Sequence, residues 1–261
     1  MNKYIYNPSA RIDFNGEIVL TQNEVLEAIR LTNDAIRKLH EQTSTEQINI
    51  FEILGMRNLS GVVGEYFGRC IVSAANGKLH SNLHQDGYPD LILINTPEKK
   101  AYFQTLYTEK NGKKYPNSKS KFSPFLYGGL EVKATCGCVP PATESRAKPI
   151  IGEQRIENIK SFDWKAHHRA TNHLLALLWD FIDEIPTVVA CFYRSDLTVQ
   201  DWGKIVQPKP EGGKTTSVSV MPPRGVKRMC EGWVAVLDNP IYTRHLSNRK
   251  WIGFDVRTIN S

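Results

Sequence analysis

Residues 87–94 read Gly-Tyr-Pro-Asp-Leu-Ile-Leu-Ile, a turn followed by a short, continuous apolar run. A run of this kind, bounded by turn residues, predicts a strand that is buried on both faces. A second such stretch, residues 127–134, reads Tyr-Gly-Gly-Leu-Glu-Val-Lys-Ala. We expect the two stretches to be adjacent strands of one sheet, and the segments around them decide the rest of the fold.

Helices are predicted before these strands. Residues 21–24, Thr-Gln-Asn-Glu, have the form of a capping box, in which a hydroxyl and a glutamate satisfy free amides at a helix start. Residues 44–47, Ser-Thr-Glu-Gln, repeat that form and predict a second helix start. A third helix is predicted from Ser60, because apolar residues follow at helical spacing as far as Ala74 and Asn76-Gly77 supplies a stop signal.

The second half of the chain continues the alternation of helices and strands. Residues 168–185 are strongly apolar and end before a proline, which predicts a helix, and residues 187–193 (TVVACFY) predict a buried strand. Two β-like pieces follow at residues 215–220 and 233–237. This order indicates an α/β fold with a central mixed sheet flanked by helices. No internal repeat or clear linker divides the chain, so we expect one domain over residues 1–261.

Basic residues are concentrated in two segments. The net charge is +6, from 33 Lys and Arg against 27 Asp and Glu. Residues 98–121 contain seven lysines and two acids, and residues 204–228 contain six basic residues and one acid, so each segment carries +5 and the remainder carries −4. Two basic, turn-rich segments favour a polyanionic partner such as DNA, although lysine-rich surface loops would give the same pattern.

The sequence argues against membrane attachment and export. The longest apolar run is interrupted by Asp180, Asp183 and Glu184 and is shorter than a bilayer-spanning helix requires. The N-terminus, MNKYIYNPSARIDF, lacks the apolar centre of a signal peptide. The 5 cysteines are an odd number without disulfide-like spacing. We therefore expect a reduced, cytoplasmic protein with no membrane partner.

Two acids and a lysine on the predicted strands form the candidate site. Side chains alternate along a strand, so Glu131 and Lys133 point to the same face, where Asp90 from the adjacent strand can meet them. Adjacent buried carboxylates require a neutralising cation. Two carboxylates together with a backbone carbonyl suit Mg²⁺, a hard ion that prefers oxygen ligands. An ion pair between Glu131 and Lys133 on an edge strand is the simpler alternative.

Pro89-Asp90 and Glu131-Val132-Lys133 resemble the motif of the PD-(D/E)xK nucleases, and specifically that of the type II restriction endonucleases. The likeness covers roughly residues 60–195 in the order of elements. It implies a restriction-endonuclease-like catalytic core over residues 59–195, preceded by an N-terminal helical region (residues 1–58) and followed by C-terminal β-rich elaborations that read DNA (residues 196–261).

The resemblance also implies an activity. It implies Mg²⁺-dependent hydrolysis of both strands of a short duplex DNA sequence, leaving 5′-phosphates. Asp90, Glu131 and the Val132 carbonyl would hold the metal ion, and Lys133 would orient the attacking water. Many enzymes of the family place an acid on the helix before the first core strand, where this chain has Glu65.

The sequence departs from the family pattern in one respect. The gap between the two halves of the motif is longer than usual, which we interpret as an inserted hairpin or loop around residues 110–113. Asp86 is the reserve candidate for the first carboxylate.

The expected partners are duplex DNA, a second copy of the chain because two strands must be cut, and a cognate DNA methyltransferase as a genetic partner. Arg224, between two prolines and a glycine, is the candidate reader of guanine. The candidate DNA-binding residues are Lys113, Lys114, Lys209, Lys214, Thr215, Thr216, Arg224, Lys227 and Arg228. A repair or recombination nuclease of the same fold and a non-catalytic DNA-binding module are the alternatives.

Overall fold

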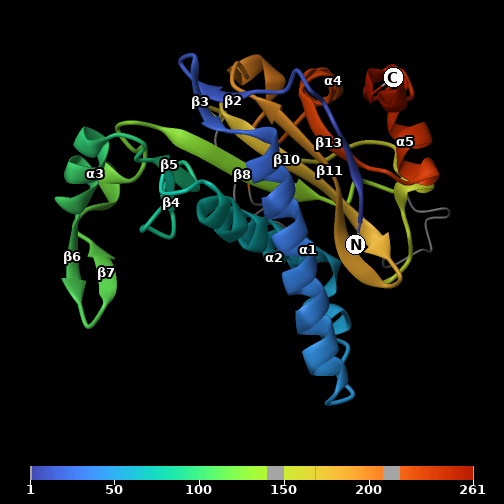
Figure 1. Ribbon diagram of the computed structural model, residues 1–261, viewed down its shortest axis with the longest axis horizontal. Helices are drawn as coiled ribbons and strands as arrows, with labels where there is room; N and C mark the ends of the chain where they lie inside the picture. The colour runs from blue at the N-terminus through green and yellow to red at the C-terminus, as the bar shows by residue number, and fades with distance from the viewer. Residues whose placement is uncertain (1, 140–149, 168, 208–217, 261) are drawn as a thin grey trace.

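A seven-stranded mixed sheet forms the centre of the protein in a computed structural model that describes residues 2–139, 150–167, 169–207 and 218–260. The strands lie in the order β1-β13-β11-β10-β8-β5-β4 (Figure 1). Their bounds are Tyr4–Tyr6 (β1), Leu79–Ser81 (β4), Leu91–Leu93 (β5), Gly129–Thr135 (β8), Leu174–Ile182 (β10), Ile185–Arg194 (β11) and Trp233–Leu237 (β13). The β8–β10 pair is parallel and the other pairs are antiparallel, which confirms the predicted α/β class with a mixed sheet.

Helix α1 (Gln22–Ser44) begins at the predicted capping box. The Thr21 amide donates to Glu24 Oε2 at 2.6 Å, and the Glu24 amide donates to Thr21 Oγ1 at 3.3 Å. The helix start predicted at residues 44–47 is wrong, because Ser44 is the last residue of α1. That stretch instead forms the turn into the next helix.

Helix α2 (Ile50–Ala74) contains the helix predicted from Ser60. It begins earlier than predicted because Asn49 caps it, with Oδ1 accepting from the Phe51 amide at 3.1 Å. Gly55, with a φ of 65°, interrupts the helical backbone near this end. The predicted stop is confirmed, since Asn76 and Gly77 both have positive φ.

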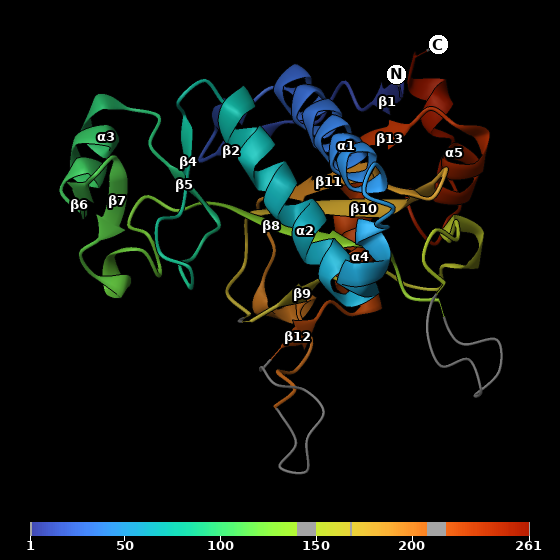
Figure 2. The ribbon, with the colours of Figure 1, turned by 90° about the horizontal axis from the view of Figure 1, so that it is seen from below.

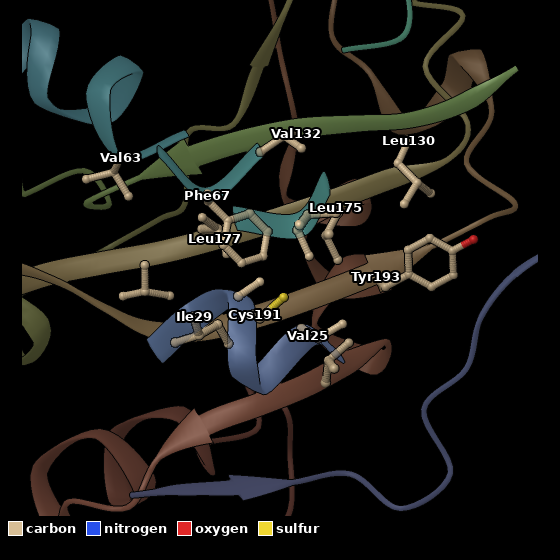
Figure 3. Close-up of a cluster of buried hydrophobic side chains, with 14 of the residues drawn as sticks. Val25, Ile29, Val63, Phe67, Leu130, Val132, Leu175, Leu177, Cys191 and Tyr193 are labelled. Carbon is tan, nitrogen blue, oxygen red and sulfur yellow. The ribbon is translucent and has the colours of Figure 1, made fainter. Parts of the chain in front are cut away.

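Helices α1 and α2 cover one face of the sheet (Figure 2). Side chains from both helices interdigitate with those of the central strands, and Figure 3 shows this cluster. Its labelled members are Val25 and Ile29 on α1, Val63 and Phe67 on α2, and Leu130, Val132, Leu175, Leu177, Cys191 and Tyr193 on the strands. This packing fixes α2 against β8 and β5, the strands predicted to carry the site.

The opposite face of the sheet packs against the C-terminal part of the chain. The described elements there are η2 (Ile156–Asn158), β9 (Lys165–Ala166), η3 (Val199–Asp201), β12 (Ser219–Val220), α4 (Pro223–Glu231), α5 (Pro240–Leu246) and η4 (Val256–Asn260). The strand predicted at residues 233–237 is β13. Of the piece predicted at residues 215–220, Ser219–Val220 forms β12 and residues 215–217 lie outside the described residues. The β-rich expectation for residues 196–261 is wrong, because helices form most of their described regular structure. Pro222 is the N-cap residue of α4.

The helix predicted at residues 168–185 is also wrong. Within this stretch Leu174–Ile182 forms strand β10, and a two-residue turn then leads into β11. Nearly every residue of β10 is buried because both faces of the sheet are covered, and such a run has no strand periodicity that separates it from a buried helix. Asp183 and Glu184 form the turn with positive φ, a conformation usually taken by Asn or Gly. The strand predicted at residues 187–193 is confirmed within β11.

An inserted unit connects β5 to β8. It contains α3 (Pro97–Gln104), β6 (Tyr107–Lys110), β7 (Lys113–Pro116) and η1 (Lys119–Lys121). The insertion predicted around residues 110–113 is confirmed, and of the two predicted forms, hairpin or loop, it is a hairpin. A further hairpin joins β2 (Ile12–Phe14) to β3 (Glu17–Leu20), within the N-terminal region that was predicted to be helical.

None of the described helices combines the length and the hydrophobicity needed to cross a bilayer.

Gly129 allows β5 and β8 to pair at the site. A Cβ atom on Gly129 would lie 1.8 Å from the Leu91 carbonyl oxygen, a collision between main chains that no side-chain movement relieves. We expect Gly129→Ala to destabilise the fold by roughly 3 kcal/mol. Gly61→Ala is the matched control, because nothing lies within 4 Å of its Cβ position and alanine favours a helix. Urea denaturation of both variants checks this, and equal stability would contradict it.

Candidate active site

The candidate site lies where β5 and β8 separate. The two strands pair only at Leu91 with Leu130 and at Ile92 with Gly129. Beyond this point the Asp90 side chain supplies the hydrogen-bond acceptor that a neighbouring strand would otherwise supply, because the Val132 amide donates to Asp90 Oδ2 at 2.9 Å. The chain thus places the predicted carboxylate at the fork between the strands.

Glu131 and Lys133 complete the cluster. The Asp90 amide donates to Glu131 Oε2 at 3.1 Å. Lys133 Nζ lies 2.6 Å from Glu131 Oε1 and 3.2 Å from Asp90 Oδ2, so one ammonium contacts both carboxylates. The Asp90 side chain is 41% exposed, whereas that of Glu131 is 9% exposed. The structure therefore brings together all three residues, with Asp90 on the solvent side.

Burial and charge act against each other in this cluster. Burial raises the pKa of Glu131, the charge of Lys133 opposes this shift, and that of Asp90 adds to it. Burial alone would lower the pKa of Lys133, but Glu131 and Asp90 outweigh it and hold that pKa above its usual range. Lys133 is therefore a permanent cation between the carboxylates.

A cleft of about 520 Å³ opens at the cluster. Asp90, Lys133 and the backbone of β8 line one side, and α2 lines another with glycines, which leave the space open. Glu65, on the same helix, also lines the cleft and is exposed. Within the described part of the chain it has no hydrogen bond or ion pair with Asp90 or Lys133, so its role stays a prediction.

The donor set fits a hard divalent cation. Both carboxylates supply oxygen, and Val132 directs its carbonyl to the same side of β8 as its amide, which faces Asp90. Across the described ranges, no group of three or more His, Cys, Asp and Glu side chains is arranged to hold a metal ion. Mg²⁺ does not require one, because it commonly takes one or two carboxylates and completes its shell with water and substrate phosphate.

The described residues among those predicted to bind DNA lie on two elements. Lys113 and Lys114 are exposed on the β6–β7 hairpin, and Arg224 and Lys227 are exposed on α4. Arg228, also on α4, has protein partners: its guanidinium contacts the Asp201 carboxylate and lies 2.8 Å from Asp196 Oδ2. Lys209, Lys214, Thr215 and Thr216 lie outside the described residues. DNA contact by these residues stays a prediction.

The cleft also contains residues that the motif did not identify. Arg69 lines the cleft one helical turn after Glu65. The four-residue spacing, which places both on one face of the helix, was the sequence feature that could have identified Arg69. His84 lines the cleft from the loop before β5, where Asn82 holds the chain by donating to the Pro89 and Phe122 carbonyls at 2.9 and 3.0 Å. Arg69 and His84 thus line the same cleft as Asp90 and Lys133.

Tyr88 lies close to Glu131 beside the cleft. Burial raises the pKa of Tyr88 to about 12, and the negative charge of Glu131 adds to this shift. Its hydroxyl donates to the Ala170 carbonyl at 3.4 Å, which places the ring between the carboxylate and the segment before β10.

No protein-family model matches this chain, and neither a curated protein sequence nor a solved structure is significantly similar to it.

Proposed function

We propose that this protein is a Mg²⁺-dependent endonuclease, similar to a type II restriction endonuclease, that hydrolyses both strands of a short duplex DNA sequence. One observation carries the proposal: Lys133, which lines an open cleft together with Asp90, contacts the carboxylates of both Asp90 and the buried Glu131 at the fork of two strands. A purely structural ion pair requires one acid and no cleft. Two acids with one base at a cleft suit a reaction that neutralises phosphate charge.

The residues have distinct roles in the proposed reaction. Asp90, Glu131 and the Val132 carbonyl would hold Mg²⁺, which supplies Lewis-acid polarisation of the phosphate and lowers the pKa of a bound water. Lys133 donates a hydrogen bond to the attacking water and offsets the charge that develops on phosphate oxygen. The water oxygen bonds to phosphorus and the bond to the 3′ oxygen breaks, which yields a 5′-phosphate and a 3′-hydroxyl.

A plasmid digest tests the proposal. We expect the protein to convert supercoiled plasmid into discrete fragments with Mg²⁺ and to leave it intact with EDTA. Replacing Mg²⁺ by Ca²⁺ should preserve a gel shift without cleavage. Smears or structure-dependent nicks would favour a repair nuclease, and a gel shift without cutting under every condition would favour a DNA-binding module. The proposal would be contradicted if the protein neither cleaved nor bound any of a set of plasmids that together present many sequences.

Homodimer formation belongs to the same proposal. Cutting both strands at a symmetric site requires two active sites related by a two-fold axis. Sedimentation of the protein with a cleaved duplex in Ca²⁺ is therefore expected to give a complex with two chains for each DNA.

A further inference from the structure

The β6–β7 hairpin in the inserted unit has a tightly defined tip. Its turn, Asn111-Gly112, has φ values of 50° and 69°, which is the geometry of a two-residue type I′ turn. The strand register pairs Lys110 with Lys113 and Thr108 with Tyr115. The positions of the tip side chains are therefore set by regular pairing.

The hairpin has one face that packs and one face that does not. Lys114 lies on the packed face, with Nζ 4.9 Å from the ring centroid of Tyr107 and 5.4 Å from that of Phe103 on α3. The rings of Tyr107 and Phe103 are themselves 5.1 Å apart. Because paired residues share a face and successive residues alternate, Lys110, Lys113 and Tyr115 lie on the other face. All three side chains are exposed there.

The charge on this exposed face is uncompensated. Lys110 and Lys113 are directly opposite each other, and like charges in that position destabilise a hairpin. Within the described part of the chain, neither lysine has an acidic group within ion-pair distance. A polyanion placed across this face would remove the repulsion.

The inserted unit is fixed relative to the candidate site. It starts after β5 and ends at β8, the strands that carry Asp90 and the Glu131–Lys133 pair. A separate core anchors it to β5 and consists of Ile92, Ile94, Phe103, Leu106, Phe122 and Phe125. Figure 1 shows the hairpin below α3, beyond the edge of the sheet formed by β4 and β5, and the loop between these two strands lines the cleft.

We infer that the exposed hairpin face, formed by Lys110, Lys113 and Tyr115, binds phosphates of duplex DNA that extends beyond the cleft. This inference rests on the proposed function. The two ammonium groups contact phosphate oxygens, and Tyr115, which is 50% exposed, packs its ring against sugar and offers its hydroxyl to phosphate. Such contacts position the duplex over Asp90 and Lys133 without reading its sequence.

The salt dependence of DNA binding tests this inference. Fluorescence anisotropy with a labelled duplex in Ca²⁺ compares the full-length wild type with the double variant Lys110→Gln and Lys113→Gln. The slope of log affinity against log salt should fall by about 1.8, or about 0.9 for each phosphate that the variant no longer neutralises. If the two proteins bind equally at about 1 M salt, the variant should bind about 60-fold more weakly at about 0.1 M.

A charge-matched control separates specific contact from net charge. Lys3 and Lys38 are exposed on other parts of the molecule, so Lys3→Gln with Lys38→Gln removes the same charge away from the hairpin. We expect this control to keep the wild-type slope. Removing the opposed lysines should not lower the urea midpoint of the hairpin variant, because it relieves repulsion.

The outcomes distinguish the hairpin from the proposed function. A wild type that cuts DNA, together with a hairpin variant that keeps the wild-type salt slope, would overturn the inference and leave the nuclease intact. The inference would also fail if the slope fell equally in both double variants. A wild type that neither binds nor cuts duplex DNA would overturn the proposed function, and the hairpin assignment with it.

Discussion

The Asp90→Asn variant should cleave DNA at least about 100-fold more slowly than the wild type, a loss typical of removing one group that stabilises transition-state charge. Asparagine keeps the shape of the side chain and an oxygen that can accept from the Val132 amide, so the fork between β5 and β8 should persist. It removes the negative charge that faces Lys133 and the proposed metal ion. Single-turnover cleavage of a duplex that the wild type cuts measures the effect.

Asp86→Asn is the matched control for this variant. Asp86 lies on the same loop, four residues earlier, but its side chain is 69% exposed and its ion pair with Lys119 is long, at 3.4 Å. Surface pairs of this kind contribute little, so cleavage should stay within about twofold of the wild type. Both variants should bind DNA in Ca²⁺ and unfold at the wild-type urea concentration. Equal cleavage by Asp90→Asn and the wild type would remove Asp90 from the site, and a larger loss in Asp86→Asn would favour the reserve carboxylate.

Replacing Glu131 or Lys133 by alanine extends the same test. We expect each change to abolish cleavage, because the site then lacks either a metal ligand or the ammonium that contacts both carboxylates. Lys133→Ala should also lower stability, since it leaves the buried Glu131 carboxylate without its cation. A stable Lys133→Ala variant that still cuts would contradict the assignment.

The candidate cluster could be predicted from the sequence because it depends on local rules. Alternation along a strand places Glu131 and Lys133 on one face, and a turn before an apolar run places Asp90 at a strand end. The cleft depends on how α2 packs against β8. The motif residues around Asp90 carry no information about this tertiary packing. Arg69 and His84 could therefore be identified as residues of the site only from the structure.

The errors in the predicted fold also arise from tertiary packing that local sequence patterns do not reveal. The apolar stretch at residues 168–185 was interpreted as a helix because a strand covered on both faces loses its alternation. Its turn, Asp183-Glu184, lacks the Asn or Gly that would have marked a hairpin. Asp180 is the notable exception within this stretch, because it is an acid in the middle of a buried apolar strand.

Asp180 is fully buried and accepts hydrogen bonds from several elements. The Arg155 amide donates to Oδ1 at 2.8 Å and the Ile156 amide donates to Oδ2 at 3.0 Å, so the segment that follows β8 is tied to β10. The Phe181 amide donates to Oδ1 at 2.8 Å, and the Tyr242 hydroxyl on α5 donates to Oδ2 at 3.1 Å. One carboxylate thus satisfies three buried amides and one hydroxyl.

Asp180→Ala should therefore destabilise the protein by about 4 kcal/mol or more, because each buried donor left without a partner costs roughly 1–3 kcal/mol. Asp180→Asn keeps one acceptor oxygen and should lose about half as much. Urea denaturation followed by tryptophan fluorescence measures both, and the asparagine variant remains informative if the alanine variant does not fold. Asp238→Ala is the control: this exposed acid follows β13, and its nearest cation, Arg257, is 3.9 Å away, so its loss should cost less than about 0.5 kcal/mol. Equal urea midpoints for the Asp180 and Asp238 variants would show that the carboxylate does not hold these elements together.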